Sequence, residues 1–114
     1  MYLVYRSSAS ACDRMLFTAW ILNATSETLL DVRLEMQSFT NSRFERLQYE
    51  TQPEEKLMTS RVLGPRRSLQ YSFTYQLTSR DVAESVLLSS ALGVELRSKT
   101  LGRLYSECDA VVAT

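Results

Sequence analysis

The stretch LQYSFTYQL, residues 69–77, alternates apolar and polar residues without a break. Successive side chains of a β-strand point to opposite faces, so this order places the apolar groups on one face and the polar groups on the other. The stretch therefore predicts a β-strand with one buried and one solvated face. We expect this strand to lie at the centre of the core.

Similar strand-like runs lie on both sides of this stretch. The expected runs, separated by polar or Gly/Pro turns, cover residues 2–8, 15–24, 30–37, 45–51, 56–63, 66–77, 86–99 and 103–112. This spacing is typical of an all-β sandwich of about eight antiparallel strands in two sheets. Gly93 can mark a β-bulge. One helical turn is expected near 79–84, because Thr78 and Asp81 form a capping-box pattern.

The length and composition fit one folded domain. The chain has 114 residues, of which 45% are hydrophobic and 23% charged, with three glycines and two prolines. A chain of this length buries roughly two thirds of its unfolded surface, so a packed core is expected. We expect a single domain over residues 1–114, cut from a larger protein. No apolar run approaches the roughly 18 residues that span a membrane, so membrane insertion is not expected.

Charge and residue content argue against nucleic-acid binding and catalysis. Thirteen basic and thirteen acidic residues leave no net charge, so the field that attracts phosphate backbones is absent. The chain has no histidine, which excludes Ser-His-Asp and Cys-His catalysis, and its isolated glycines form no phosphate loop. The carboxylate pairs Glu54-Glu55 and Asp31 with Glu35 are interpreted as surface charges. We therefore expect no enzyme activity, no metal and no cofactor.

The two cysteines and one sequon leave the compartment open. Cys12 and Cys108 are interpreted as buried free thiols of a cytosolic protein, although a bridge between them is geometrically possible. Asn23-Ala24-Thr25 is a formal glycosylation sequon that matters only in a secreted protein, and we interpret it as chance. A glycan on Asn23 together with a bridge would favour an extracellular protein.

The second run offers two arrangements. If Phe17, Ala19 and Ile21 face the core, then Trp20 and Leu22 point away from it and become candidate anchors for a partner. Alternatively, the strand is covered on both faces or its register is reversed, with Trp20 as the core tryptophan usual in such sandwiches. We favour the second arrangement, and the first stays open.

Arginine and lysine residues are further candidate contacts. Arg66 and Arg67 follow the Gly-Pro turn, Arg33 lies on the polar face of 30–37, and Arg97 and Lys99 lie on that of 86–99. Arg33 is flanked by acidic residues, with which cross-strand charge pairing is expected. The others could form a basic rim that receives acidic peptide residues, or they could only keep the surface soluble.

Two segments resemble a known class of module. FTAWILNATSETLLDV, residues 17–32, resembles the strand, Asn turn and following strand of immunoglobulin-like modules, which include gamma-adaptin-type ear (appendage) domains and bacterial surface repeats. LGPRRSLQYSFTY, residues 63–75, resembles the next turn and strand, with the usual Pro-Gly order inverted. The resemblance implies an immunoglobulin-like sandwich. The ear branch implies a cytosolic module at the end of a trafficking or coat-complex subunit.

The leading functional expectation is a non-catalytic, cytoplasmic protein-interaction module within, or recruited to, a larger intracellular complex. Its partner would be a protein or short peptide that docks at a strand edge or on the Trp20 face. The expected partner-binding residues are Trp20, Leu22, Arg33, Arg66, Arg67, Arg97 and Lys99. One alternative is an extracellular structural or adhesive immunoglobulin-like repeat. Another is a carbohydrate-binding module, which would need Tyr49, Tyr71 and Tyr75 exposed, although the alternation argues that Tyr71 and Tyr75 are buried.

Overall fold

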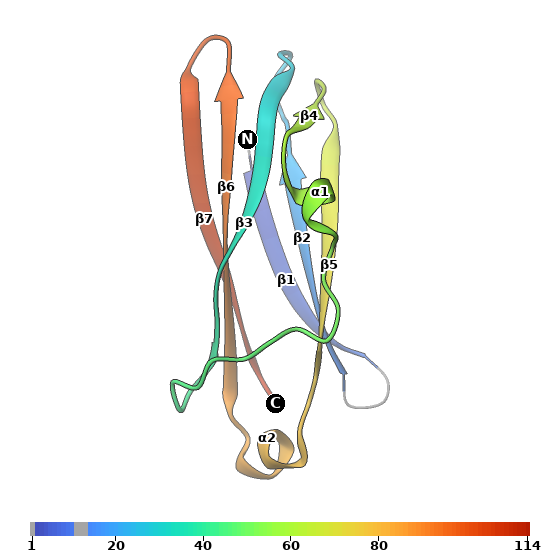
Figure 1. The fold of residues 1–114 in the computed structure, drawn as a ribbon, viewed down its shortest axis with the longest axis vertical. Helices are drawn as coiled ribbons and strands as arrows, with labels where there is room; N and C mark the ends of the chain where they lie inside the picture. Colours follow the sequence, from blue (N-terminus) through green and yellow to red (C-terminus); the bar gives the residue numbers. More distant parts are fainter. Residues whose placement is uncertain (1, 11–13) are drawn as a thin grey trace.

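Two antiparallel sheets pack face to face in an elongated sandwich of 50 × 25 × 22 Å (Figure 1). The computed structural model describes the backbone of residues 2–10 and the whole of residues 14–114. The three-stranded sheet has the order β1 (Tyr2–Ser10), β2 (Arg14–Leu22), β5 (Ser68–Gln76). The four-stranded sheet has the order β4 (Arg61–Leu63), β3 (Leu29–Asn41), β6 (Leu87–Ser98), β7 (Gly102–Ala113). The predicted all-β sandwich is confirmed, with seven strands in the described chain.

The alternating stretch forms β5. Tyr71, Phe73 and Tyr75 are buried, and Gln70 and Ser72 are exposed, as the alternation predicts. However, β5 is the outer strand of its sheet and β2 is the central one, so the expected central place of β5 is wrong. Alternation reports which face of a strand is buried, and it carries no information on how many strands pair with its edges.

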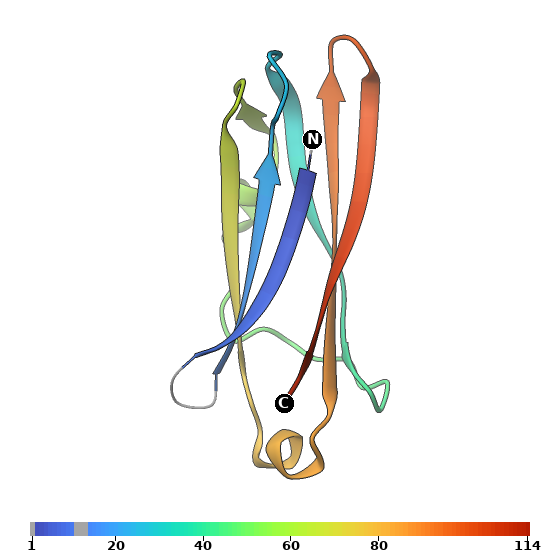
Figure 2. The same cartoon turned by 180° about the vertical axis from the view of Figure 1, so that it is seen from behind.

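The two lateral sides of the sandwich are closed by different segments. β1 lies beside β7, the outer strand of the other sheet (Figure 2). On the other side, the segment after β3 crosses to the three-stranded sheet, where the backbone of Thr51 pairs with Thr74 of β5. The hydroxyls of these two threonines also lie 2.5 Å apart. Part of the edge of β5 is therefore covered by this crossing segment.

The crossing segment is where two expected strands fail. Residues 45–51 form no named strand, only isolated bridges from Arg46 to Thr40 and from Thr51 to Thr74. The reason is that this segment passes from one sheet to the other and can pair with only one residue at each. Residues 56–63 divide into the helix α1 (Glu55–Met58) and the short β4. Their apolar residues come in adjacent pairs, 57–58 and 62–63, which is not the period of a strand.

The expected helical turn is confirmed as α2 (Ser79–Glu84), which closes one end of the sandwich. Its capping box is complete, because the Asp81 backbone N–H donates to Thr78 Oγ1 and the Thr78 N–H donates to Asp81 Oδ2, both at 3.0 Å. Asp81 is buried and also accepts a 2.7 Å hydrogen bond from the Tyr75 hydroxyl. Burial acts to raise the pKa of Asp81, but the hydrogen bonds from Thr78 and Tyr75 hold it below its usual value.

Gly93 does not mark a bulge in its own strand. The pairing of β6 with β7 runs through Gly93 without a shift, and the irregularity lies in β3 between Met36 and Ser38. A Cβ at Gly93 would lie 2.5 Å from the Tyr105 hydroxyl and 2.7 Å from Gln37 Nε2. Glycine leaves room for these two side chains to meet above it and hydrogen-bond, and a larger residue would displace them.

Candidate functional site

β2 turns Trp20 away from the core. Phe17, Ala19 and Ile21 are fully buried between the sheets, whereas Trp20 and Leu22 are half-buried on the opposite face. The favoured expectation of a core tryptophan is therefore wrong, and the first arrangement is found. The odd-numbered positions already fill the inner face, and the period of two leaves the even-numbered positions outside.

Three of the predicted residues meet at one end of the sandwich. Leu22, Arg66 and Arg67 line a shallow hollow of about 410 Å³ between the end of β2 and the turn before β5. Within residues 14–114, neither arginine has an ion-pair partner. Trp20 does not line this hollow. The result is a small basic corner in which Leu22 is the large apolar side chain.

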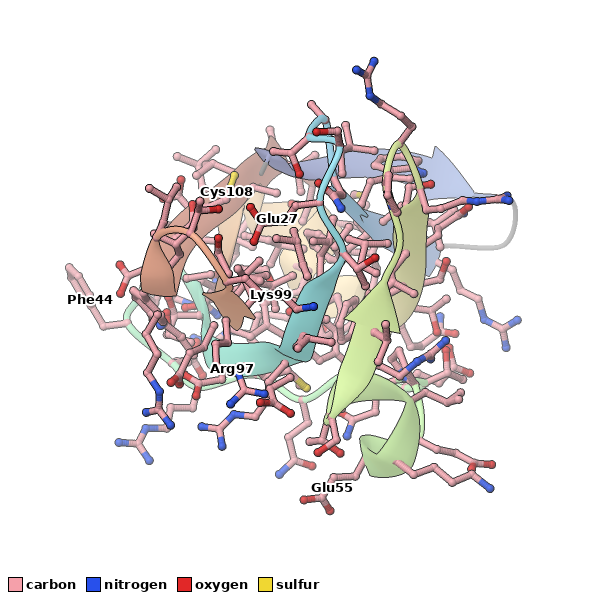
Figure 3. The ribbon with its side chains drawn as sticks, turned by 90° about the horizontal axis from the view of Figure 1, so that it is seen from above. Glu27, Phe44, Glu55, Arg97, Lys99 and Cys108 are labelled. Carbon is pink, nitrogen blue, oxygen red and sulfur yellow. The ribbon has the colours of Figure 1, made fainter. Side chains whose placement is uncertain are left out.

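The other three predicted residues lie elsewhere. Arg33 lies on β3. Arg97 lies on β6 and Lys99 in the turn after it (Figure 3). Arg33 pairs with Glu35, and Arg97 pairs with Asp31 at 3.2 Å. The seven predicted residues therefore do not form one surface, and the ion pairs leave Arg33 and Arg97 less charge to offer a ligand.

Glu27 fastens the loop after β2 to the turn after β6. Its carboxylate accepts hydrogen bonds from Ser98 Oγ and the Lys99 backbone N–H, both at 2.6 Å, and from Thr100 Oγ1. Figure 3 shows Glu27 and Lys99 together in the view from above. The hydrogen bonds from Ser98 and Thr100 lower the pKa of Glu27 to about 2 from a usual 4.5.

Replacing Glu27 is expected to give a pH-dependent loss of stability. The folded chain holds this carboxylate ionised more strongly than the unfolded chain does, so its stabilisation is complete above about pH 4.5 and disappears as the pH falls towards 2. Glu27→Gln should therefore have a lower Tm than the wild type at pH 7, and the two values should converge near pH 2. Thermal unfolding between pH 2 and 7 measures this difference.

The matched control is Glu54→Gln, which removes an exposed carboxylate whose described partner is Lys56 at 3.2 Å. A single exposed ion pair of this kind contributes little, so the Tm should stay close to the wild type at every pH. If the Tm of Glu27→Gln were lower than that of the wild type by the same amount from pH 2 to 7, the carboxylate charge would not be what stabilises the turn.

β3 has an open edge along its middle. One side of this strand pairs with β6 from Leu30 to Asn41. The other side pairs with β4 only as far as Val32 and is next bridged at Thr40, where the crossing segment leaves the strand. The Leu47 N–H also donates to the Phe39 carbonyl at 2.8 Å. Between these points, residues 33–38 have no strand beside them in the described chain.

A groove follows this open edge, and we call it the β3 groove. Its central hollow of about 430 Å³ lies between Met36, Gln37 and Ser38 on β3 and Gln48 and Gln52 on the crossing segment. Shared lining residues join it to a hollow of about 320 Å³ towards α1 and to one of about 370 Å³ towards Arg46. The groove therefore consists of three adjoining hollows along β3, with Glu55 in the lining at one end and Arg46 in the lining at the other.

The walls of the β3 groove are held by contacts with the core. The ring of Tyr49 stacks on Phe39 with 4.3 Å between centroids, and its hydroxyl hydrogen-bonds to Ser90. On the α1 side, the Tyr71 hydroxyl donates to the Leu57 carbonyl at 2.8 Å. These contacts fix the position of the crossing segment and of α1 relative to the core, so the groove is preformed.

Several polar groups in the groove are left without protein partners. The side-chain amides of Gln48 and Gln52 form no hydrogen bond within the described residues, and neither Arg46 nor Glu55 has an ion-pair partner there. Phe44, two residues before Arg46, is 92% exposed and lies in a turn at φ 62° (Figure 3). A bulky residue in this conformation is uncommon, and an exposed aromatic side chain is a typical anchor for a protein partner.

Sequence reasoning missed the groove and the residues that line it. The sequence feature that could have indicated the groove is the lack of alternation in residues 52–60 around Pro53. A segment without alternation is not expected to form a strand that pairs with the edge of β3. The carbohydrate platform is not formed, because Tyr71 and Tyr75 are buried and Tyr49 is packed against the core. Cys108 carries a free thiol that is only half-buried, so its expected burial is wrong, and Cys12 lies outside the described residues.

No three histidine, cysteine, aspartate or glutamate side chains of the described residues lie together as a metal site would need. Neither described helix is long and apolar enough to cross a membrane.

The two packed antiparallel sheets define an immunoglobulin-like sandwich as the class of fold. A solved structure of similar fold is the collagen-binding subdomain ACE19 of the Enterococcus faecalis surface protein ACE. It aligns with a TM-score of 0.51 over 100% of this chain and 97% of its own length, at 10% sequence identity. This likeness concerns the fold, and it gives no support to the gamma-adaptin ear in particular. The chain matches no protein-family model and no curated protein sequence.

Proposed function

We propose that this domain is a non-catalytic protein-binding module that acts outside the cell as an adhesive or structural immunoglobulin-like unit, with its partner bound in the β3 groove. The observation that carries the proposal is the open middle of β3 with a preformed groove beside it. An open strand edge flanked by a groove is a recurrent place for a protein partner to bind. The shared fold of a collagen-binding subdomain of a surface protein supports the adhesive setting.

Filling the β3 groove is expected to abolish partner binding without unfolding the domain. Ser38 is exposed and lines both the central hollow and the hollow towards Arg46, so Ser38→Trp places an indole in the groove. We expect the wild type to bind at least one of immobilised triple-helical collagen, fibronectin and fibrinogen in a saturable manner. Ser38→Trp should weaken that binding at least tenfold, measured by surface plasmon resonance.

The matched control is Ser72→Trp, because Ser72 is an exposed serine of β5 that does not line the groove. Its affinity should equal that of the wild type. Binding that survives Ser38→Trp would exclude the groove as the contact surface. The absence of saturable binding to all three proteins would contradict the adhesive function.

A second candidate is the cytoplasmic interaction module that the ear resemblance implies. The free thiol of Cys108 favours it, because cytosolic proteins keep their thiols reduced. Protease and antibody access on intact cells distinguishes the two proposals. Access without permeabilisation supports the extracellular module, and access only after permeabilisation supports the cytoplasmic one.

A further inference from the structure

We infer that the β3 groove binds an extended peptide segment that adds to β3 as a further strand, with an uncharged centre, a carboxylate beside Arg46 and a basic side chain beside Glu55. This inference rests on the proposed function, since it names the kind of segment that the groove would take from a protein partner. Three observations carry it: the open strand edge, the unpaired amides and the charges at the two ends.

The open edge supplies the backbone groups. A β-strand presents N–H and C=O groups along each edge, and an edge without a neighbour is a template for another strand. Residues 33–38 form such an edge in the described chain, between the end of the β4 pairing and the bridge at Thr40. At about 3.3 Å per residue, these positions accommodate a segment of roughly six residues.

The centre of the groove is suited to uncharged side chains. Met36 is partly exposed on the β3 side, and Leu47 gives the opposite wall an apolar contact. The amides of Gln48 and Gln52 each carry a donor and an acceptor with no partner in the described residues, so they can bond to peptide amides or hydroxyls. A charged side chain here would lose water without gaining an opposite charge.

The two ends of the groove carry opposite charges. Arg46 lines the hollow at one end, and Glu55 lines the hollow at the other. Neither is neutralised by an ion pair within the described residues, in contrast to Arg43, which pairs with Glu45 and Glu84. A bound segment with an acidic end and a basic end can therefore lie in one direction with both charges matched, and reversing it places like charges together.

Two synthetic peptides of about eight residues test this inference. Both have alternating valine and threonine in the centre, and they carry aspartate and lysine at opposite ends in the two possible orders. We expect wild-type protein to bind one order at least fivefold more tightly, measured by fluorescence polarisation at low salt. The double variant Arg46→Glu/Glu55→Lys, which reverses both charges, should prefer the peptide with the other order. The matched control is the double variant Arg66→Glu/Glu54→Lys, which should keep the wild-type preference.

Backbone addition is tested separately from charge. Two further peptides carry N-methyl groups on alternate amides, one on the odd-numbered and one on the even-numbered positions. In an added strand only every second N–H faces β3, so one of these two peptides loses the donors that bond to β3. That peptide should bind at least tenfold more weakly. Equal binding of both charge orders, or full binding by both methylated peptides, would overturn the inference. A thermal unfolding curve like that of the wild type verifies that the reversed variant is folded, and Arg46→Gln serves as a milder substitute if it is not.

The outcome also separates this inference from the proposed function. If neither peptide binds and Ser38→Trp still abolishes binding of a protein partner, the groove is a binding site but not for an extended strand, and the inference is wrong. If Ser38→Trp leaves binding of the protein partner intact, the partner does not bind in the β3 groove, and the proposed function is wrong.

Discussion

Phe17→Ala is expected to lower the free energy of unfolding by about 3–5 kcal/mol, the largest effect of any substitution considered for this domain. Phe17 is fully buried, and its ring meets Phe39 edge-on at 5.4 Å and Tyr49 at 6.0 Å. Phe17 belongs to β2, and Phe39 belongs to β3 in the other sheet. The substitution therefore opens a cavity at the point where the two sheets are held together.

Urea denaturation followed by tryptophan fluorescence measures this loss. A domain of this size is stable by about 5–15 kcal/mol, so this loss is a large part of the wild-type stability. Leu16→Ala is the matched control, since Leu16 is the neighbouring residue on the outer face of β2 and is half-buried. It should cost no more than about 1.5 kcal/mol. Equal losses from the two variants would mean that β2 does not turn its odd-numbered residues into the core.

Asn23→Ala is expected to lower the free energy of unfolding by about 2–3 kcal/mol. The Asn23 side chain is buried, and its Nδ2 donates to the carbonyls of Glu27, Leu63 and Gly64 at 2.8, 3.1 and 3.0 Å. Its Oδ1 accepts from the Thr25 N–H at 3.0 Å. Alanine would remove the hydrogen bond to the buried Leu63 carbonyl and would release the side-chain ties between the loop after β2 and the turn after β4.

The control for Asn23→Ala is Ser26→Ala, because Ser26 is an exposed residue of the same loop. Its effect should stay within about 0.5 kcal/mol. Asn23→Asp provides a second arm, since a carboxylate is nearly isosteric with the amide but cannot donate to carbonyls. It should destabilise at least as strongly as alanine. A stable Asn23→Asp variant would show that the three donated hydrogen bonds are not what holds the loop.

The same hydrogen bonds determine whether the sequon Asn23-Ala24-Thr25 can carry a glycan. Asn23 Nδ2 is the atom that would carry a glycan, and in the folded domain it is buried and bonded to three carbonyls. A glycan at this position is incompatible with the fold. Glycosylation of Asn23 is therefore not a usable indicator of an extracellular location, contrary to the expectation from the sequence, and intact-mass measurement of the folded protein should find Asn23 unmodified.

The parts of the fold that were predictable are those set by neighbouring residues. The buried face of β5 follows from its alternation, and α2 follows from the capping pattern of Thr78 and Asp81. The β3 groove was not predicted, and only three of the predicted contact residues lie together. Leu22, Arg66 and Arg67 do meet, but they meet because β2 ends beside the turn before β5, which is a pairing between residues more than 40 positions apart.

The sequence by itself determined which residues face the core in most strands, because the direction of a side chain depends on the local period of two. It could not determine which strand edges are paired, because pairing depends on segments that are distant in the chain. Only the tertiary structure decided that β5 lies at the border of its sheet, that the crossing segment leaves the middle of β3 open, and that Arg46 and Glu55 lie at the two ends of the resulting groove.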